Sequence, residues 1–251
     1  MSSNAKDALR YENSPAVSGD TCESGPTMPA LDGPLEIIGP WEIRTARYLI
    51  RPLRETDRAE YVEMLAESRA SLDEYLPLHR GPETDHEVFD RQMSLARASA
   101  TCPDVAVRRV IEGEGRLIGA ININDIQQGK QRSAEIAVWI TRSAAGHGAA
   151  GEVVSAVAEH ALASAPRGLG LDVVYALVSP GNAAAIRVFE RAGFMEVPNV
   201  PLVELVVGGA WRPHSLFIRE ASPIVTTPPE PMGRAAAKIV VRRLMASASR
   251  A

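Results

Sequence analysis

The most constraining stretch of this sequence is an apolar segment followed by two closely spaced glycines and an alanine-rich segment. Residues 134–140 alternate as a β-strand does, and residues 149–163 have the apolar pattern of a helix. Gly146 and Gly148 lie between them and can adopt positive φ angles, so that successive backbone N–H groups point toward one place. Because a helix start also carries partial positive charge, the pattern predicts a phosphate-binding loop.

The remaining pattern predicts an α/β fold (α+β mixed), in which a central, mostly antiparallel mixed sheet has helices on both faces. Strands are expected at residues 43–53, 105–112, 116–125, 134–140, 173–178, 203–207 and 211–218. Helices are expected at residues 57–66, 71–76, 83–100, 149–163 and 182–192, the last capped by Asn182 and ended by Gly193.

Composition narrows the classes of function. The chain has 251 residues, of which 45% are hydrophobic, enough for one catalytic-size domain. Its net charge of −4 argues against nucleic acid as the main partner. Its two cysteines, Cys22 and Cys102, lack metal-ligand spacing, so no metal is expected. No apolar run predicts an integral membrane span and no secretory signal is present, so a cytoplasmic location is expected.

Three regions are expected along the chain. Residues 1–36 are polar and rich in Ser, Pro and Gly, which predicts a disordered N-terminal extension. Residues 41–220 form the catalytic domain. Residues 221–251 form a proline-rich linker and a short basic C-terminal helix. We favour a solvated or docking helix there over a tether to an anionic surface.

A second segment, S-P-G-N-A-A-A-I-R-V-F-E-R-A-G-F, runs from Ser179 to Phe194. Together with the glycine loop it resembles the GCN5-related N-acetyltransferases (GNAT), and among them the RimJ/RimL-type branch that acetylates amino groups. The family segment P-x-N-x-x-S-x-R-[VL]-[FLY]-E-[KR]-x-G-F is matched at most positions, with Ala185 in place of the serine. The family loop Q/R-x-x-G-x-G/A is matched at Gly148 and Ala150 but has Ala145 in place of Gln or Arg. The resemblance covers residues 41–220.

The resemblance implies a GNAT fold with splayed central strands and acetyl-CoA as cosubstrate. It implies the following cofactor-binding residues: Val138, Trp139, Ile140, Gly146, His147, Gly148, Ala149, Ala150, Asn182 and Arg187. The loop N–H groups are expected to hold the pyrophosphate, and the side chain of His147 is expected to face solvent. Val138 and Ile140 have a second interpretation, as a strand face packed on a helix, and both roles can coexist.

The resemblance also implies catalytic residues. Glu135 occupies a position where some family members place the general base, although an exposed strand glutamate is an equal alternative. Ala185 and Phe189 replace hydroxyl groups that the family uses as acids for the leaving thiolate. We therefore expect Ser179, or water, to supply that proton.

Tyr75 and His214 are the expected substrate-binding residues. Their alternatives are packing on the sheet for Tyr75 and a structural histidine bonded to backbone for His214. His160 is expected to be a core or boundary histidine. The expected acceptor is a protein or peptide N-terminal amine. The alternatives are a small-molecule amine such as an antibiotic or amino acid, a degenerate acyl-CoA-binding sensor, and a non-catalytic interaction protein. The resemblance also leaves a homodimer open.

Overall fold

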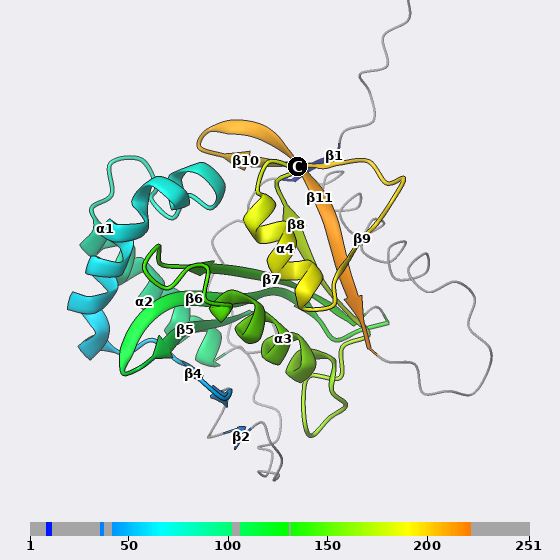
Figure 1. Cartoon of the computed structure of the whole chain (residues 1–251), viewed down its shortest axis with the longest axis horizontal. Coiled ribbons are helices and arrows are strands. Elements are labelled where there is room, and N and C mark those ends of the chain that lie inside the picture. Colours follow the sequence, from blue (N-terminus) through cyan, green and yellow to red (C-terminus); the bar gives the residue numbers. More distant parts are fainter. Residues whose placement is uncertain (1–8, 12–35, 38–41, 102–105, 131, 222–251) are drawn as a thin grey trace, which may run out of the picture.

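A computed structural model describes residues 9–11, 36–37, 42–101, 106–130 and 132–221 (Figure 1). The helices are η1 (Glu55–Asp57), α1 (Arg58–Tyr75), α2 (Asp85–Thr101), α3 (Ala149–Leu162) and α4 (Ala183–Arg191). The strands are β1 (Leu9–Tyr11), β2 (Glu36–Ile37), β3 (Ile43–Arg44), β4 (Tyr48–Arg51), β5 (Val107–Gly113), β6 (Arg116–Gln127), β7 (Ser133–Ile140), β8 (Val173–Val178), β9 (Met195–Glu196), β10 (Val203–Val207) and β11 (Ala210–Glu220).

These strands form one mixed, mostly antiparallel sheet, as expected. Its order is β1-β10-β11-β8-β7-β6-β5-β4-β3-β2, with β9 added beside β11. Two pairs of neighbours are parallel, namely β1 with β10 and β7 with β8. The second of these joins the antiparallel first half of the domain to its βαβα second half.

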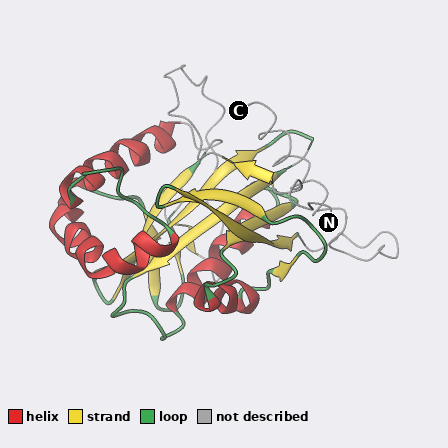
Figure 2. Ribbon diagram, turned by 90° about the horizontal axis from the view of Figure 1, so that it is seen from above, coloured by secondary structure: helices red, strands yellow, loops and turns green. Residues whose placement is uncertain are grey.

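Two helical layers cover the sheet (Figure 2). Helices α1 and α2 pack on one face, where Tyr61, Leu65 and Phe89 meet Val110 and Trp139 of the strands. Helices α3 and α4 lie beside each other on the opposite face (Figure 1) and bury a larger set of aliphatic side chains from strands β3 to β8. The side chains of β7 therefore alternate, with Ala134, Ile136, Val138 and Ile140 toward α3 and α4, and Trp139 toward α1 and α2.

The two central strands separate before they end. Strands β7 and β8 pair only at Ser133 with Val173, Ala134 with Val174, and Glu135 with Tyr175. Strand β7 continues to Ile140 and β8 to Val178 without further pairing to each other. The sheet therefore forks at Glu135 and Tyr175.

Several boundaries differ from expectation. The single strand expected at 43–53 is wrong: β3 and β4 form a tight hairpin in which Thr45 N donates to Tyr48 O at 2.9 Å. The helices expected at 57–66 and 71–76 are one continuous helix, α1, because the buried residues Met64, Leu65, Ser68 and Leu72 keep one face of it on the core throughout. Strand β9 was not expected. The other elements lie within a few residues of their expected bounds.

One piece of the extension expected to be disordered, β1, is a strand in the structure, and β2 begins at the last residue of that extension. Strand β1 pairs with β10, and β2 pairs with β3. The remaining residues up to 35, and the expected linker and basic helix beyond 221, lie outside the described residues. In the part of the chain that the structure describes, no helix is both long and apolar enough to cross a membrane.

Candidate active site

The glycine loop leads from the end of β7 to the start of α3. Gly146 has φ of 82° and Gly148 has φ of 81°, and no other residue type adopts such angles as readily. Gly148 is the N-cap of α3 and provides no side-chain cap, so the first N–H groups of the helix keep their capacity for a ligand. Gly146, His147 and Gly148 are exposed, whereas Ala149 is buried and Ala150 half-buried. The loop thus has the conformation and the open surface that a phosphate requires.

Arg47 braces this loop from the β3–β4 turn. Its Nη1 donates to His147 O at 3.1 Å, and its Nε donates to Glu152 Oε2 at 2.8 Å. Thr45 Oγ1 donates to Glu152 Oε1 at 2.6 Å, which fixes the carboxylate that orients Arg47. Sequence reasoning missed Arg47, because a residue 100 positions from His147 gives no local signal.

The residues expected to bind the cofactor from β7 lie beside the fork. Val138 and Ile140 are half-buried and pack on the α3/α4 side, so the strand-face interpretation holds for their side chains. Trp139 points to the other side and meets Tyr61 edge-on, with ring centroids 6.3 Å apart. Only backbone groups of Trp139 are therefore placed for a ligand on the α3/α4 side. Beyond Glu135 the edge of β7 that faces β8 has no strand partner.

On the other arm of the fork, β8 leads into the turn before α4. Ser179 is half-buried there, and its carbonyl accepts from Asn182 N at 2.9 Å. Asn182 Oδ1 accepts from Ala185 N at 3.0 Å, which confirms the expected N-cap. Arg187 is exposed. Phe189 is only 4% exposed and packs edge-on against Phe194 at 5.1 Å, so it belongs to the core beneath α4.

Glu135 lies at the fork on the α1/α2 face of the sheet, because its neighbours Ala134 and Ile136 face the opposite way. It is paired with Asn124 of β6 on one side and Tyr175 of β8 on the other. Burial raises the pKa of its carboxyl group, while the Asn124 amide and the Arg108 guanidinium oppose that rise. Such a carboxylate is a better proton acceptor near neutral pH than an exposed one.

The two expected substrate-binding residues are separated. Tyr75 is half-buried at the end of α1, near the β10–β11 turn, where a Cβ on Gly208 would lie 3.9 Å from Asp73 O. His214 lies in β11, four residues before Ile218, which is the residue level with Tyr175 and Glu135, and it is 4% exposed. Its Nδ1 lies 2.9 Å from Arg212 O, and burial lowers its pKa, as the structural interpretation expects.

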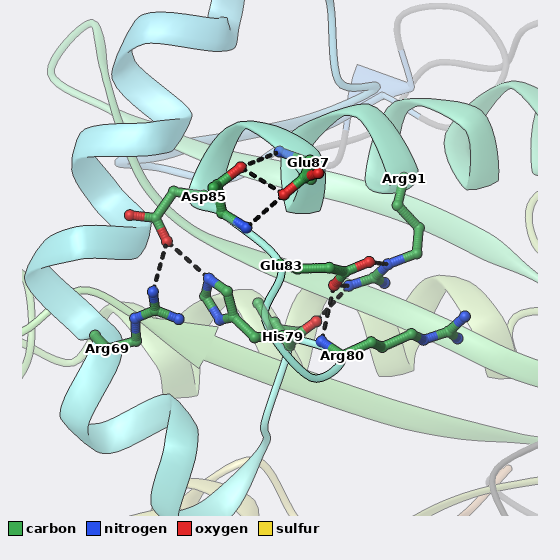
Figure 3. A network of polar contacts seen from close by, with 9 residues as sticks. Arg69, His79, Arg80, Glu83, Asp85, Glu87 and Arg91 are labelled. Atoms are coloured by element: carbon green, nitrogen blue, oxygen red, sulfur yellow. Dashed lines mark hydrogen bonds and ion pairs between the residues drawn. The ribbon is translucent and has the colours of Figure 1, made fainter.

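A polar network holds the connection between α1 and α2 on the same face as Glu135 (Figure 3). His79 Nε2 lies 2.7 Å from Asp85 Oδ1, and Arg91 Nη2 donates to Glu83 Oε2 at 2.8 Å. Thr84 and Glu87 form a capping box at the start of α2, with Thr84 N donating to Glu87 Oε2 at 2.7 Å. These contacts hold the segment between α1 and α2 against the start of α2.

Comparison with known proteins identifies the fold. The family model "Acetyltransferase (GNAT) domain" matches residues 47–195. Mycobacterium smegmatis RimJ in complex with CoA-disulfide is 25% identical, with a TM-score of 0.60 over 78% of this chain and 89% of that chain. A ribosomal-protein-S5-alanine acetyltransferase from Vibrio fischeri is 16% identical, with a TM-score of 0.62 over 75% of this chain and 100% of that chain.

A spermidine N-acetyltransferase from Vibrio cholerae in complex with CoA and spermine is 20% identical, with a TM-score of 0.55 over 70% of this chain and 97% of that chain. The sequence has no match among curated proteins.

Within the described residues no group of three or more His, Cys, Asp or Glu side chains could hold a metal ion. The family match, which covers more than half of the chain, and the forked sheet together show that the chain belongs to the GNAT acetyltransferases, which are acetyl-CoA-dependent acyltransferases.

Proposed function

We propose that this protein transfers the acetyl group of acetyl-CoA to the N-terminal amine of a protein or peptide. The observation that carries the proposal is the fork at Glu135 and Tyr175. The phosphate-type loop opens on its α3/α4 side, whereas the carboxylate of Glu135 lies on its α1/α2 side. A thioester and an amine can therefore approach each other from opposite faces of one sheet.

Bound acetyl-CoA supplies an activated acetyl group as a thioester. The N–H groups at Gly146, Gly148 and Ala149 are suited to its phosphates, because the loop is open and the helix start has no side-chain cap. Backbone groups of Val138, Trp139 and Ile140 along the unpaired edge of β7 are suited to the amide-rich arm, and the exposed Arg187 adds positive charge at α4.

Side chains of this protein then accept one proton from the amine and donate one proton to the leaving thiolate. The acceptor nitrogen forms a bond to the thioester carbonyl carbon, the carbon–sulfur bond breaks, and the sulfur leaves as a thiolate. Glu135 takes the proton that the amine loses. Ser179, at the end of β8, or a water molecule gives a proton to the thiolate, whose ordinary pKa near 8.5 makes it a fair leaving group even without help.

An N-terminal amine is a better acceptor than a lysine side chain for a site whose proposed base is the single carboxylate of Glu135. An α-amino group has a pKa of about 8, whereas a lysine has one of about 10.4, so near neutral pH more of the α-amine is already neutral and a single carboxylate suffices to take the proton that the reaction releases. The likeness to a ribosomal-protein-S5-alanine acetyltransferase and to a ribosomal L7/L12 alpha-N-protein acetyltransferase supports the same class of acceptor. The spermidine N-acetyltransferase neighbour keeps a small-molecule amine as the second candidate.

Mass spectrometry of peptides incubated with the full-length protein and acetyl-CoA tests this proposal. The panel contains peptides with free N-termini, a polyamine, free amino acids and lysine peptides with blocked N-termini. We expect acetylation of free N-termini and little elsewhere. Acetylation of the polyamine or of free amino acids alone would support the second candidate. Tight CoA binding without transfer to any amine would support a sensor.

A further inference from the structure

Arg108 is half-buried, and within the described residues its guanidinium forms no direct ion pair, although the Glu135 carboxylate attracts it from farther away. It lies in β5 with its side chain in a pocket between α1, α2 and the sheet. The other polar residues that line this pocket are Tyr61, Gln92, Arg109 and Asn122, and Trp139 lies in its wall. The pocket is small, with a cavity volume of about 20 Å³, and it opens to solvent at its mouth.

The single polar contact assigned to the Arg108 side chain within the described chain is neutral. Asn122 lies directly opposite on β6. With its amide oriented to satisfy its neighbours, Asn122 Oδ1 accepts from Arg108 Nη1 at 3.2 Å and Nδ2 donates to Ile121 O at 3.2 Å. One amide oxygen uses one of the five N–H groups of a guanidinium and neutralises none of its charge.

Two other arginines that are removed from solvent, Arg51 and Arg91, are paired with carboxylates. Arg51 donates to Asp57 at 2.8 and 3.0 Å and to Glu112 at 2.7 Å. Arg91, which lies near the same pocket, is held by Glu83 (Figure 3). A guanidinium removed from water is costly unless an anion compensates it, so an unpaired one in a pocket marks a candidate binding site.

The electrostatic surroundings of Arg108 favour an added anion. Burial lowers the pKa of its guanidinium, and the charges of Arg91 and Arg80 lower it further. Tyr61 and Glu135 act in the opposite direction. A carboxylate entering the pocket would relieve this repulsion and could accept two parallel N–H bonds from the guanidinium.

The register of the sheet relates this pocket to Glu135. Arg108 is opposite Asn122, and Asn122 is opposite Ala137 of β7, two residues beyond Glu135 on the same face. Strands lie about 4.8 Å apart and residues advance about 3.3 Å along a strand, so the two Cα atoms are separated by roughly 12 Å. Because both side chains are long and lie on the same face, a molecule whose amine and carboxylate are a few bonds apart is the right size to contact both charged ends.

We propose that Arg108 binds a carboxylate carried by the acceptor, so that the preferred substrate is an amine with an acidic group a few bonds from it. The inference rests on the proposed function, since it uses Glu135 as the place where the amine reacts. Two sources supply this chemistry. One is the side chain of an N-terminal Asp or Glu in a peptide, and the other is the α-carboxylate of a free amino acid.

Matched acceptors test the proposal on the full-length wild-type protein. Peptide amides that begin with Asp and Asn are compared, then a pair that begins with Glu and Gln, together with free aspartate and free alanine. We expect kcat/KM to be at least about tenfold higher for the acidic member of each peptide pair, a difference equal to about 1.4 kcal/mol. Strong activity with free amino acids and none with peptide amides would assign the subsite to the α-carboxylate. Equal rates within both pairs, with free amino acids inactive, would overturn the proposal.

Variants at Arg108 separate recognition from a structural role. Arg108→Gln should raise KM for the Asp peptide and leave the Asn peptide nearly unchanged, whereas Arg108→Lys should retain part of the preference. Arg116→Gln is the control, because that arginine is 76% exposed on the β5–β6 hairpin. An equal loss with both peptides in Arg108→Gln would mean that Arg108 only supports the fold, and would overturn the proposal.

Binding measurements keep the inference separate from the proposed function. Calorimetry of the CoA-bound wild-type protein with Asp and Asn peptides measures the subsite without turnover. If no amine is acetylated, the proposed function fails, but tighter binding of the Asp peptide would still support Arg108 as a carboxylate site. If peptides are acetylated but bind with equal affinity and react with equal kcat/KM, the function stands and the inference fails.

Discussion

Glu135 and Tyr175 are the last residues that β7 and β8 hold in register. The carboxylate proposed as the base therefore lies at the point where the sheet opens. Its neighbours along β7 face α3 and α4, while its own side chain faces α1 and α2. In the proposed reaction, the end of the pairing between β7 and β8 is the place where the two substrates meet, and the side chain of Glu135 lies at that position.

Replacing this base should change the pH dependence of the reaction. In the wild type, kcat/KM should rise with pH as Glu135 loses its proton, and burial moves that rise upward from the ordinary pKa of a glutamate. Glu135→Gln should lose this limb and lower kcat/KM by about 10²–10⁴-fold. Steady-state rates across mildly acidic to mildly alkaline pH measure both effects. Glu63→Gln, an exposed glutamate on α1, is the control. A variant with the wild-type profile would remove Glu135 from the chemistry.

The glycine loop should not tolerate a carboxylate. Gly148→Asp places a negative charge and a strained backbone at the proposed phosphate site, and its Cβ would lie 3.5 Å from Arg47 Nη2. Calorimetry should show CoA affinity reduced by at least tenfold, about 1.4 kcal/mol. Gly115→Asp is a matched control, because Gly115 also has positive φ, 74°, and open surroundings but lies at the β5–β6 turn. Equal CoA affinity in the two folded variants would contradict the phosphate assignment.

Arg47 should act on CoA through the loop it braces. Arg47→Gln removes its ion pair with Glu152, at 2.7 Å, and its bond to His147 O. The loop then loses the contact that ties it to the β3–β4 turn, so CoA affinity should fall several-fold while the melting temperature changes little, since surface ion pairs contribute little to stability. Calorimetry and thermal unfolding of the variant measure the two effects. Unchanged CoA affinity would show that the loop is ordered without Arg47.

His160 should make the fold sensitive to acid. Burial lowers the pKa of its imidazole to about 4, from an ordinary value of 6.5. The folded state therefore resists protonation, and stability should be fully present above pH 6.5 and fall as the pH drops toward 4, by up to about 3 kcal/mol. His160→Gln should flatten this part of the stability curve measured by denaturant unfolding. His147→Gln, at an exposed position, should leave it unchanged, and an identical slope in all three proteins would contradict the assignment.

The elements around the glycine loop could be predicted because their signals are local. Apolar alternation identifies β7, a continuous apolar run identifies β8, Asn182 caps α4, and Gly148 precedes α3. The β3–β4 hairpin could not, because its turn depends on Thr45 and on contacts with Glu152 more than 100 residues away. Strand β1 was missed for a similar reason, since three residues become a strand only by pairing with β10.

The candidate site could be predicted only for those of its residues that lie in one continuous segment of the sequence. Glu135 and the loop follow each other in sequence, whereas Arg108 and Asn122 reach the same face through the register of β5 and β6. The alternation Ile121-Asn122-Ile123-Asn124 was a usable signal, because polar residues at every second position of a central strand gather on one face. Whether Asn122 and Asn124 lie on the same face as Glu135 depends on the order of the strands, and the sequence of one segment does not determine that order.

The most direct test of the central claim is the transfer of one acetyl group to a free N-terminus. The full-length protein, acetyl-CoA and a peptide with a free α-amine are incubated while free thiol and peptide mass are followed together. The account predicts one thiol released for each acetyl group gained, with the group on the α-amine and no transfer to the same peptide with a blocked N-terminus. Thiol release that is equal with the free and the blocked peptide, or CoA binding without transfer to any amine, would contradict it.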